Sequence, residues 1–282
     1  MKLVLPKGFN NYNGWNWTLC KMLAKSGIFE ISEKEFPYKP YPGARNGNWN
    51  TIELNGIRIG IDTWDTWSPT CHYEEYFKNI YKDIKIIFKI QYYKCEYWDK
   101  TFPEKTGIKV LPWTVMPTYH FELEKIKWQN KNHKYTGSIT GRNNRFGRQP
   151  WVDEAKKYTD FYTKTDYIST DQQNDFMNIL SECKWGLILK GKQRNHDGKN
   201  RREVEFTSLN IPLAMNYIPT YPFEMKPGTH FYKMEKPSDI LKLREINPLP
   251  FVEASKYLYN NYFSPIGMSK LLIKLVEQNI CK

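Results

Sequence analysis

Segments with strand character alternate with segments of helical character along almost the whole chain, and this pattern limits the possible folds. Short runs rich in β-branched and aromatic residues are typical of strands, whereas apolar residues three or four positions apart are typical of helices. The expected strands are 1–6, the two arms of a hairpin over 51–62, 84–91, 107–111, 133–140, 159–163, 185–191, 211–217 and 229–234. The expected helices are 13–25, 73–81, 151–158, 171–183, 201–209, 237–243, 251–262 and 265–278. The alternation predicts an α/β protein with parallel sheets covered on both faces.

The length of 282 residues predicts about two domains. The polar stretch 129–134 suits a boundary between them, because it separates two series of strands and helices. We therefore expect two Rossmann-like domains facing a central cleft, one over 1–130 and one over 131–262. Ligands of open α/β sheets bind beyond the carboxyl ends of the strands, so functional residues are expected just after strands.

Composition and charge exclude several classes of protein. Aromatic residues make up 16% of the chain, which excludes disorder as the main state. No apolar run approaches the length of a membrane-spanning helix, and the N-terminus lacks the pattern of a leader peptide. Five scattered cysteines without a Cys-x-x-Cys pair predict neither a zinc site nor a disulfide framework. We expect a soluble cytoplasmic protein without membrane insertion, and the net charge of +12 predicts an anionic partner.

The richest candidate site follows the expected strand that ends at Lys190 and Gly191. A polar loop leads from there into a helix that begins with Arg201 and Arg202, and Glu205 lies one turn later. Helix N-termini attract anions, an arginine can hold a diphosphate with two hydrogen bonds, and a carboxylate can accept from ribose hydroxyls. The alternative is a solvated ion pair between residues three apart, which contributes only tenths of a kcal/mol.

A second basic segment follows the expected strand 133–140, where a loop carries Arg142, Arg145 and Arg148. Arginines at a strand-to-helix turn can contact an anion, and the alternatives are a solvated basic turn or a basic rim for nucleic acid. No Asp-x-Asp motif, a pair of carboxylates that could hold a divalent metal ion, occurs in the chain. The sequence therefore gives no candidate metal ligands at this site.

Two carboxylates follow a strand of the first series and are candidates for a general base. Asp62 ends the hairpin, and Asp65 lies in the next loop beside Trp64. A hydroxyl that attacks as a nucleophile needs a base to remove its proton, and a tryptophan ring offers an apolar face to a ligand. The alternative for either aspartate is a turn or helix cap. His72 is a weaker candidate, because an isolated histidine is more often structural.

The C-terminal half resembles a known family. Arg-x-x-Glu at 202–205, Ile-Pro-Leu-Ala at 211–214, Tyr-Pro-Phe at 221–223 and Gly-Thr-His-Phe-Tyr at 228–232 resemble the exostosin-like glycosyltransferases of family 47. The similarity extends over 135–243, and the size resembles that of short enzymes of large algal viruses, some of which are xylosyltransferases. The family pattern differs in having Ser before the arginine, where this chain has Arg201.

This resemblance implies a GT-B fold and an inverting glycosyltransferase that needs no metal or other cofactor. A UDP-sugar, with UDP-xylose as one candidate, would bind the C-terminal half through Arg142, Arg145, Lys190, Gly191, Arg202 and Glu205. Arginines from two turns would balance the charge of the leaving diphosphate. A glycan or glycoprotein acceptor would bind the N-terminal half beside Trp64, with Asp62 or Asp65 as the base. The last segment, 263–282, would be a helix that packs back on the first domain.

Two other functions compete with glycosyl transfer. Net positive charge with many aromatic residues also suits a protein that binds nucleic acid without catalysis. Against it, no known nucleic-acid-binding signature occurs, and the arginines gather at strand-to-helix turns. A phosphotransferase is a weaker alternative, because the chain has neither a Walker A sequence nor a kinase glycine loop.

Overall fold

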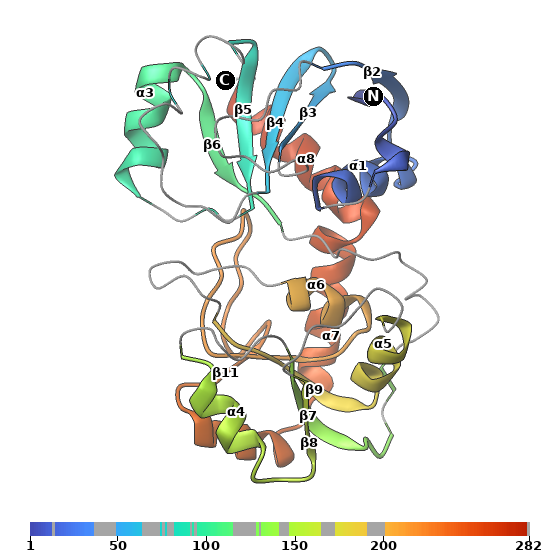
Figure 1. Ribbon diagram of the computed structural model, residues 1–282, viewed down its shortest axis with the longest axis vertical. Coiled ribbons are helices and arrows are strands. Elements are labelled where there is room, and N and C mark those ends of the chain that lie inside the picture. Colours follow the sequence, from blue (N-terminus) through green and yellow to red (C-terminus); the bar gives the residue numbers. More distant parts are fainter. Residues whose placement is uncertain are drawn as a thin grey trace. The chain divides into compact units, whose positions relative to one another are not determined.

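The protein is divided into two compact units. The computed structural model describes residues 1–12, 15–36, 49–63, 82–90, 95–114, 131–140, 147–164, 173–190 and 201–280, together with residues 74, 77, 92, 128 and 129. Unit 1 comprises 1–118, 220–222 and 264–282, and unit 2 comprises 119–219 and 223–263. The elements of both units are drawn in Figure 1.

Unit 1 is built on a six-stranded sheet with the order β2-β1-β3-β4-β5-β6. The strands are β1 (Lys2–Pro6), β2 (Glu30–Lys34), β3 (Trp49–Leu54), β4 (Ile57–Asp62), β5 (Ile84–Lys89) and β6 (Lys109–Pro112). The helices are η1 (Phe9–Asn11), α1 (Trp15–Lys25), the π-helical turn η2 (Tyr97–Thr101), α3 (Phe102–Thr106) and α8 (Pro265–Ile280). Strand β3 is antiparallel to both of its neighbours, and the other strand pairs are parallel.

The antiparallel strand follows from the β3–β4 hairpin, which the sequence predicts correctly. Asn55 and Gly56 form its two-residue turn, and both have positive φ, at 49° and 83°. Asparagine and glycine adopt this conformation at little cost, and the turn matches the twist of the two strands. The first sheet is therefore mixed rather than wholly parallel, because the hairpin inserts one reversed strand between β1 and β4.

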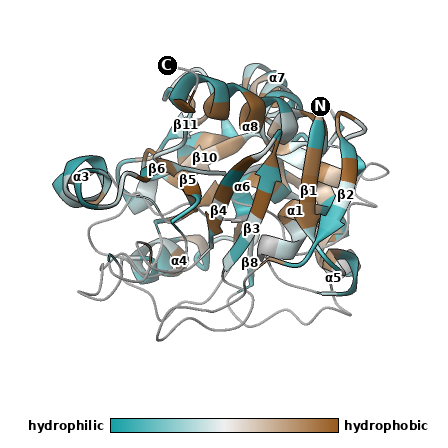
Figure 2. Ribbon diagram, turned by 90° about the horizontal axis from the view of Figure 1, so that it is seen from above, coloured by the Kyte–Doolittle hydropathy of each residue, from teal (hydrophilic) through white to brown (hydrophobic). Residues whose placement is uncertain are grey.

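Hydrophobic side chains cover the sheet of unit 1. One cluster joins Trp49, Ile87, Trp98 and Phe102, so the segment 97–106 packs through its aromatic residues. Helix α1 contacts both β3 and α8. Helix α8 alternates between hydrophobic and hydrophilic stretches (Figure 2), as expected for a helix with one buried side. The sequence predicts that the last helix packs on the first domain, and α8 belongs to unit 1. Lys109 Nζ donates a hydrogen bond to the Asn279 carbonyl of this helix at 2.8 Å.

Unit 2 contains a wholly parallel five-stranded sheet with the order β11-β10-β9-β7-β8. The strands are β7 (Tyr135–Thr140), β8 (Phe161–Lys164), β9 (Cys183–Ile188), β10 (Leu213–Met215) and β11 (Tyr232–Lys233). The helices are α4 (Gln149–Ala155), α5 (Gln173–Ser181), α6 (Arg201–Ser208), the 3-10 helix η4 (Pro237–Arg244), α7 (Leu249–Leu258) and the π-helical turn η5 (Tyr259–Phe263). Taken in chain order, the sheet has the 2-1-3-4-5 arrangement of doubly wound folds.

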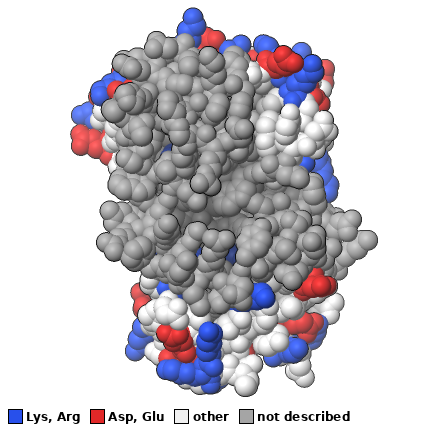
Figure 3. Space-filling model, in the orientation of Figure 1, with Lys and Arg blue, Asp and Glu red and all other residues white. Residues whose placement is uncertain are grey.

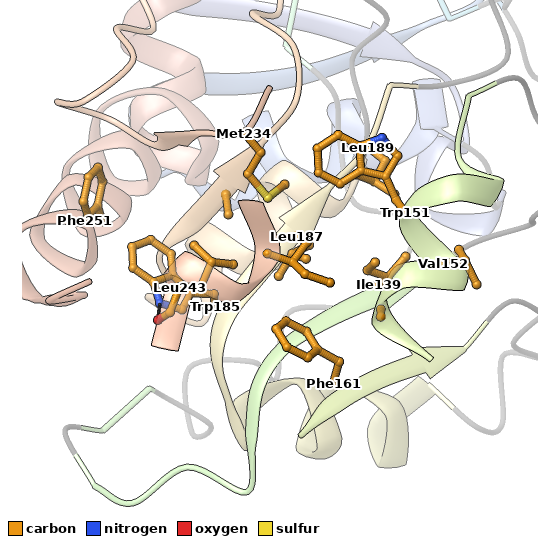
Figure 4. Close-up of a cluster of buried hydrophobic side chains, with 13 residues drawn as sticks. Ile139, Trp151, Val152, Phe161, Trp185, Leu187, Leu189, Met234, Leu243 and Phe251 are labelled. Carbon is orange, nitrogen blue, oxygen red and sulfur yellow. Dashed lines mark hydrogen bonds between the residues drawn. The ribbon is translucent and has the colours of Figure 1, made fainter. Parts of the chain in front are cut away.

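Helices of unit 2 cover both faces of its sheet. On one face, Ile139 and Leu187 pack against Trp151 of α4 (Figure 4), and Trp185 Nε1 donates to the Leu243 carbonyl at 3.1 Å. The other face carries α6. The expected fold class of two Rossmann-like α/β units is confirmed in each unit taken by itself, apart from the reversed strand β3 in unit 1.

Two features of the structure go beyond the sequence-based picture. Strand β2 was not expected, and it pairs in parallel with β1 at the sheet edge. The first segment of unit 1 ends at residue 118, whereas the sequence suggests domains over 1–130 and 131–262. The expected helix 73–81 lies largely outside the described residues, although residues 74 and 77 are helical. None of the helices in the described part of the chain combines the length and hydrophobicity needed to cross a bilayer.

Candidate functional site

The topology of unit 2 marks one place at the carboxyl edge of its sheet. Helix α4, which follows β7, packs on the face that carries Ile139. Helix α6, which follows β9, covers the opposite face, where a Cβ placed on Gly186 would lie 2.5 Å from the Phe206 ring. The chain therefore leaves the adjacent strands β7 and β9 toward opposite faces. Ligands of doubly wound sheets bind at such a switch point, beyond the carboxyl ends of the two strands.

Polar groups meet where β7 ends and α4 begins. Thr140 is the last residue of β7 and only 6% exposed, and its hydroxyl has no hydrogen-bond partner within the described residues. Arg148 stands just before α4 and reaches toward the end of β9. Its Nη2 donates to the Leu189 carbonyl at 2.9 Å, and its Nε donates to the Lys190 carbonyl at 3.1 Å. The guanidinium thereby joins the segments that follow the two strands.

A second contact holds the end of β9 from the other side. The backbone N–H of Lys190 donates to Oδ1 of Asn216, which follows β10, at 2.8 Å. Lys190, a predicted site residue, is therefore fixed at the switch point by two neighbouring segments. Neither Arg148 nor Asn216 was among the predicted donor contacts, which in the basic loop were Arg142 and Arg145. Arg148 had a signal in the basic loop, whereas Asn216 had none.

Helix α6 holds the predicted pair Arg202 and Glu205 in its first two turns. Their side chains form a direct ion pair, with Arg202 only 4% exposed and Glu205 only 2% exposed. The guanidinium carbon of Arg202 also lies 4.5 Å from the centre of the Phe176 ring, within the range of a cation–π contact. The alternative interpretation from the sequence was a solvated ion pair between these two residues. The ion pair is present, but it is buried.

The same helix carries a second buried acid. Glu203 accepts a hydrogen bond from the Tyr217 hydroxyl, and both residues are buried. A buried carboxylate is costly unless a charged or hydrogen-bonding partner faces it. The contacts with Arg202 and Tyr217 therefore allow α6 to bury two glutamates in unit 2. Arg201 begins the helix, and its side chain lies outside the described residues.

Several predicted site residues lie outside the described part of the chain. They are Trp64, Asp65, Arg142, Arg145 and Gly191, and His72 is a further one. Their roles stay predictions. The sequence nevertheless gives the charge of the segments after β7 and β9. Segment 141–146 contains two arginines, and segment 191–200 contains two lysines and one arginine against one aspartate. Both segments that leave the switch point are therefore basic.

In unit 1, the carboxyl edge holds a buried ion pair. Asp62 ends β4, Lys89 ends β5, and the two residues are paired in register. Lys89 Nζ lies 2.7 Å from Asp62 Oδ2, and both side chains are buried. Lys89 Nζ also lies 5.6 Å from the centre of the Trp98 ring. The structure thus places Asp62 at a strand end, as predicted, and gives its carboxylate a cationic partner that the sequence did not indicate.

Buried thiols and clusters of metal-ligating side chains are two further features of interest in the described residues. Burial raises the pKa of the Cys20 and Cys183 thiols to about 12, so both stay protonated at neutral pH. No group of three or more His, Cys, Asp or Glu side chains arranged to hold a metal ion occurs within the described ranges. On the face drawn in Figure 3, the described Lys and Arg side chains lie among Asp and Glu rather than in a continuous basic band.

The chain was compared with known proteins. No protein-family profile matches it, and no curated protein matches it in sequence. Among solved structures, the pneumococcal O-GlcNAc transferase GtfA in complex with UDP and GlcNAc is 12% identical, with a TM-score of 0.40 over 76% of this chain and 48% of that one. A GtfA/B complex is 8% identical, with a TM-score of 0.44 over 93% of this chain and 55% of that one. This chain spans about half the length of those structures.

Proposed function

We propose that the protein is a glycosyltransferase with a GT-B fold whose unit 2 binds the diphosphate of a UDP-sugar at the β7–β9 switch point. One observation carries this proposal. Two basic segments and the Arg202–Glu205 helix all follow the two strands that flank the switch point. Anions bind where backbone N–H groups and arginines converge, and a nucleoside diphosphate brings the charge that such a place would balance.

Different residues of unit 2 contact different sides of the donor diphosphate. Arg142 and Arg145 contact the diphosphate from the β7 side, and Lys190 with Gly191 contact it from the β9 side. Arg202 is held by Glu205 and by the Phe176 ring, so little side-chain entropy remains to be lost when a ligand binds. The Thr140 hydroxyl is a further contact, since it is buried at the end of β7 and available for a ligand oxygen.

The chemistry proposed is an inverting transfer without a metal ion. Arginines that neutralise the charge developing on the departing UDP supply the electrostatic stabilisation that a divalent cation supplies elsewhere. A hydroxyl of a glycan acceptor attacks the anomeric carbon from the opposite side, and a carboxylate of unit 1 accepts its proton. UDP-xylose is one candidate donor.

Of the two candidate bases, we propose Asp65, because the contacts of Asp62 argue against that residue. The Asp62 carboxylate is buried and paired with Lys89, so it already has a cation to hold its charge. A general base needs to reach the acceptor hydroxyl, and a fully buried carboxylate does not offer that access. Asp62 with Lys89 then serves as a fixed strand end, and Trp64 and Asp65 follow shortly after it in the sequence.

Ligand-dependent melting tests the donor site. UDP, UDP-xylose, UDP-glucose and UDP-N-acetylglucosamine are added to the full chain, with UMP and a single-stranded oligonucleotide as comparisons. A ligand at about one hundred times its Kd adds about 2.7 kcal/mol and raises the Tm by roughly 5–10 °C. We expect this rise with UDP compounds, and its loss in the double variant Arg142→Gln/Arg145→Gln.

A matched variant controls for loss of surface charge. Lys157→Gln removes an exposed lysine of unit 2 that pairs with Glu154 and belongs to neither basic segment, so UDP should still raise the Tm of this variant. Glycosyl transfer is then followed as UDP release with a panel of glycan acceptors. Absence of any UDP effect at millimolar concentration would overturn the proposal. So would binding of the oligonucleotide that weakens steeply with salt while UDP has no effect.

A further inference from the structure

Unit 2 carries a group of aromatic side chains that the donor site does not use. The four residues Phe223, His230, Tyr257 and Tyr262 form what we call the aromatic shelf. The rings of Phe223 and Tyr262 stack with centres 3.8 Å apart and planes at 5°. Tyr257 meets Tyr262 edge to face at 5.9 Å and lies parallel to His230 at 6.1 Å. Tyr257 is 49% exposed, so the shelf opens to solvent through this ring.

A departure from regular helix geometry brings the two tyrosines together. Tyr257 lies in α7, and Tyr262 follows five residues later in the π-helical turn η5. Residues five apart point in different directions on an α-helix, whereas the wider π turn moves them toward the same side. The two hydroxyls consequently lie 3.4 Å apart, and Asn261 Nδ2 donates to the Tyr257 carbonyl at 2.9 Å. Turns of this kind occur frequently at functional sites.

The shelf is neutral and offers polar groups at its edge. The backbone N–H of Lys226 donates to His230 Nδ1 at 2.9 Å, which leaves Nε2 as the protonated nitrogen of a neutral ring. Burial lowers the pKa of His230, and burial together with the Tyr257 hydroxyl raises the pKa of Tyr262 to about 12. Both rings are therefore uncharged at neutral pH.

The charged residues around the shelf are also balanced. Lys226 pairs with Glu224 at 3.1 Å, and Lys256 pairs with Glu253 at 2.6 Å. A nucleic acid or an anionic membrane is attracted by excess positive charge, which these pairs do not provide. A pyranose ring has apolar C–H faces and a rim of hydroxyls. It matches an exposed aromatic face that is bordered by phenol, imidazole and amide groups.

We propose that the aromatic shelf is a binding site for a neutral oligosaccharide, with one sugar ring stacked on Tyr257. None of its rings belongs to the segments that follow β7 or β9, which carry the proposed donor residues. Rigid aromatic side chains lose little entropy on binding, and the stacked Phe223–Tyr262 pair keeps the shelf ordered before a ligand arrives. The proposal concerns binding alone and stands whether or not unit 2 binds UDP.

Calorimetric titration of the full chain tests the shelf. The probes are cellohexaose, xylohexaose, maltohexaose and hexa-N-acetylchitohexaose. We expect at least one to bind with a Kd in the range of about 0.1–1 mM. Tyr257→Ala should weaken that binding about tenfold, which corresponds to about 1.4 kcal/mol. Tyr257→Phe keeps the ring and should weaken it much less. The exposed position of Tyr257 makes both variants compatible with folding.

Tyr12→Ala provides the matched control. Tyr12 is a tyrosine of unit 1 with 53% exposure that also stacks on a neighbouring ring, that of Trp17, and its loss should leave oligosaccharide binding unchanged. The rise in Tm with UDP should be the same in Tyr257→Ala as in the parent protein, which separates the shelf from the donor site. The proposal is overturned if no hexasaccharide binds at millimolar concentration, or if the two tyrosine variants weaken binding equally. Sedimentation with phosphatidylglycerol vesicles that depends on Tyr257, without oligosaccharide binding, would also overturn it.

Discussion

The buried pair Arg202–Glu205 gives the most quantitative prediction. Substitution of Arg202 by Met removes the guanidinium and keeps a side chain of similar length. Glu205 then remains 2% exposed without the cation that faces it in the native fold. Removal of one partner of a buried ion pair costs about 3–5 kcal/mol, because the remaining charge is left in the interior. We expect Arg202→Met to lower the free energy of unfolding of unit 2 by this amount, and Glu205→Met to lower it comparably.

The double variant Arg202→Met/Glu205→Met separates the charges from the packing. It removes both charges and fills the space with apolar atoms, and such replacements are often neutral or stabilising. We expect its stability to lie within about 1 kcal/mol of the parent. The two single losses together then exceed the loss in the double variant by about 5 kcal/mol or more, which is the coupling energy between the two sites. Hydrogen exchange of peptides from β9, on which α6 packs, measures this stability in unit 2 itself.

The outcome also decides how Arg202 acts. A loss below about 1 kcal/mol in Arg202→Met would refute the reasoning, because exposed pairs contribute no more than that. We expect the double variant to fold although it lacks Arg202. If Arg202 contacts the donor, UDP should therefore no longer stabilise this variant. An alanine variant could not answer this question, since lost folding and lost binding would coincide.

Other predictions concern packing, pH and metal dependence. Gly186→Ala places a Cβ 2.5 Å from the Phe206 ring and should lower the stability of unit 2 by about 1–3 kcal/mol, measured by urea unfolding. Burial alone would raise the pKa of Asp239, but Lys242 and two backbone N–H groups outweigh it and lower the pKa to about 2. This carboxylate should contribute about 2 kcal/mol above pH 4, lost as the pH falls toward 2, and acid titration of Asp239→Asn should lack that loss. Arg148→Gln should speed hydrogen exchange at the end of β9, because two carbonyls lose a charged donor. Transfer of sugar should persist in EDTA, and a strict requirement for Mn²⁺ would contradict the proposed mechanism.

Local patterns predict most strands and helices of this protein. The β3–β4 hairpin is marked by Asn55-Gly56, which specifies its turn without help from the rest of the chain. Strand β2, with the sequence Glu-Ile-Ser-Glu-Lys, has no such signal, because it lies at the sheet edge with both ends exposed. It is a strand because β1 offers a free edge with which it pairs in parallel. That partner is distant in the sequence and invisible to local patterns.

The candidate site shows the same limit at the level of side chains. The order of the residues places basic segments after two strands, but only the sheet order makes β7 and β9 neighbours with a switch point between them. The spacing of Arg202 and Glu205 predicts that they pair, yet it cannot tell a surface pair from a buried one. The contacts of Asp62 with Lys89 depend on parallel register between β4 and β5, which no local pattern specifies.

Buried ion pairs occur in both units close to the carboxyl ends of strands. Asp62–Lys89 lies at the ends of β4 and β5, and Arg202–Glu205 lies in the first turns of the helix that follows β9. Apolar residues of similar size would commonly give equal or greater stability, so stability alone does not account for retained charges in the interior. The carboxyl edge is where α/β sheets bind ligands. A charge held in place there by its partner costs no further desolvation when a ligand arrives. Under the proposed function, the two pairs would orient charge toward bound molecules. The double variant of α6 keeps the fold but lacks the charges, so it separates that role from stability.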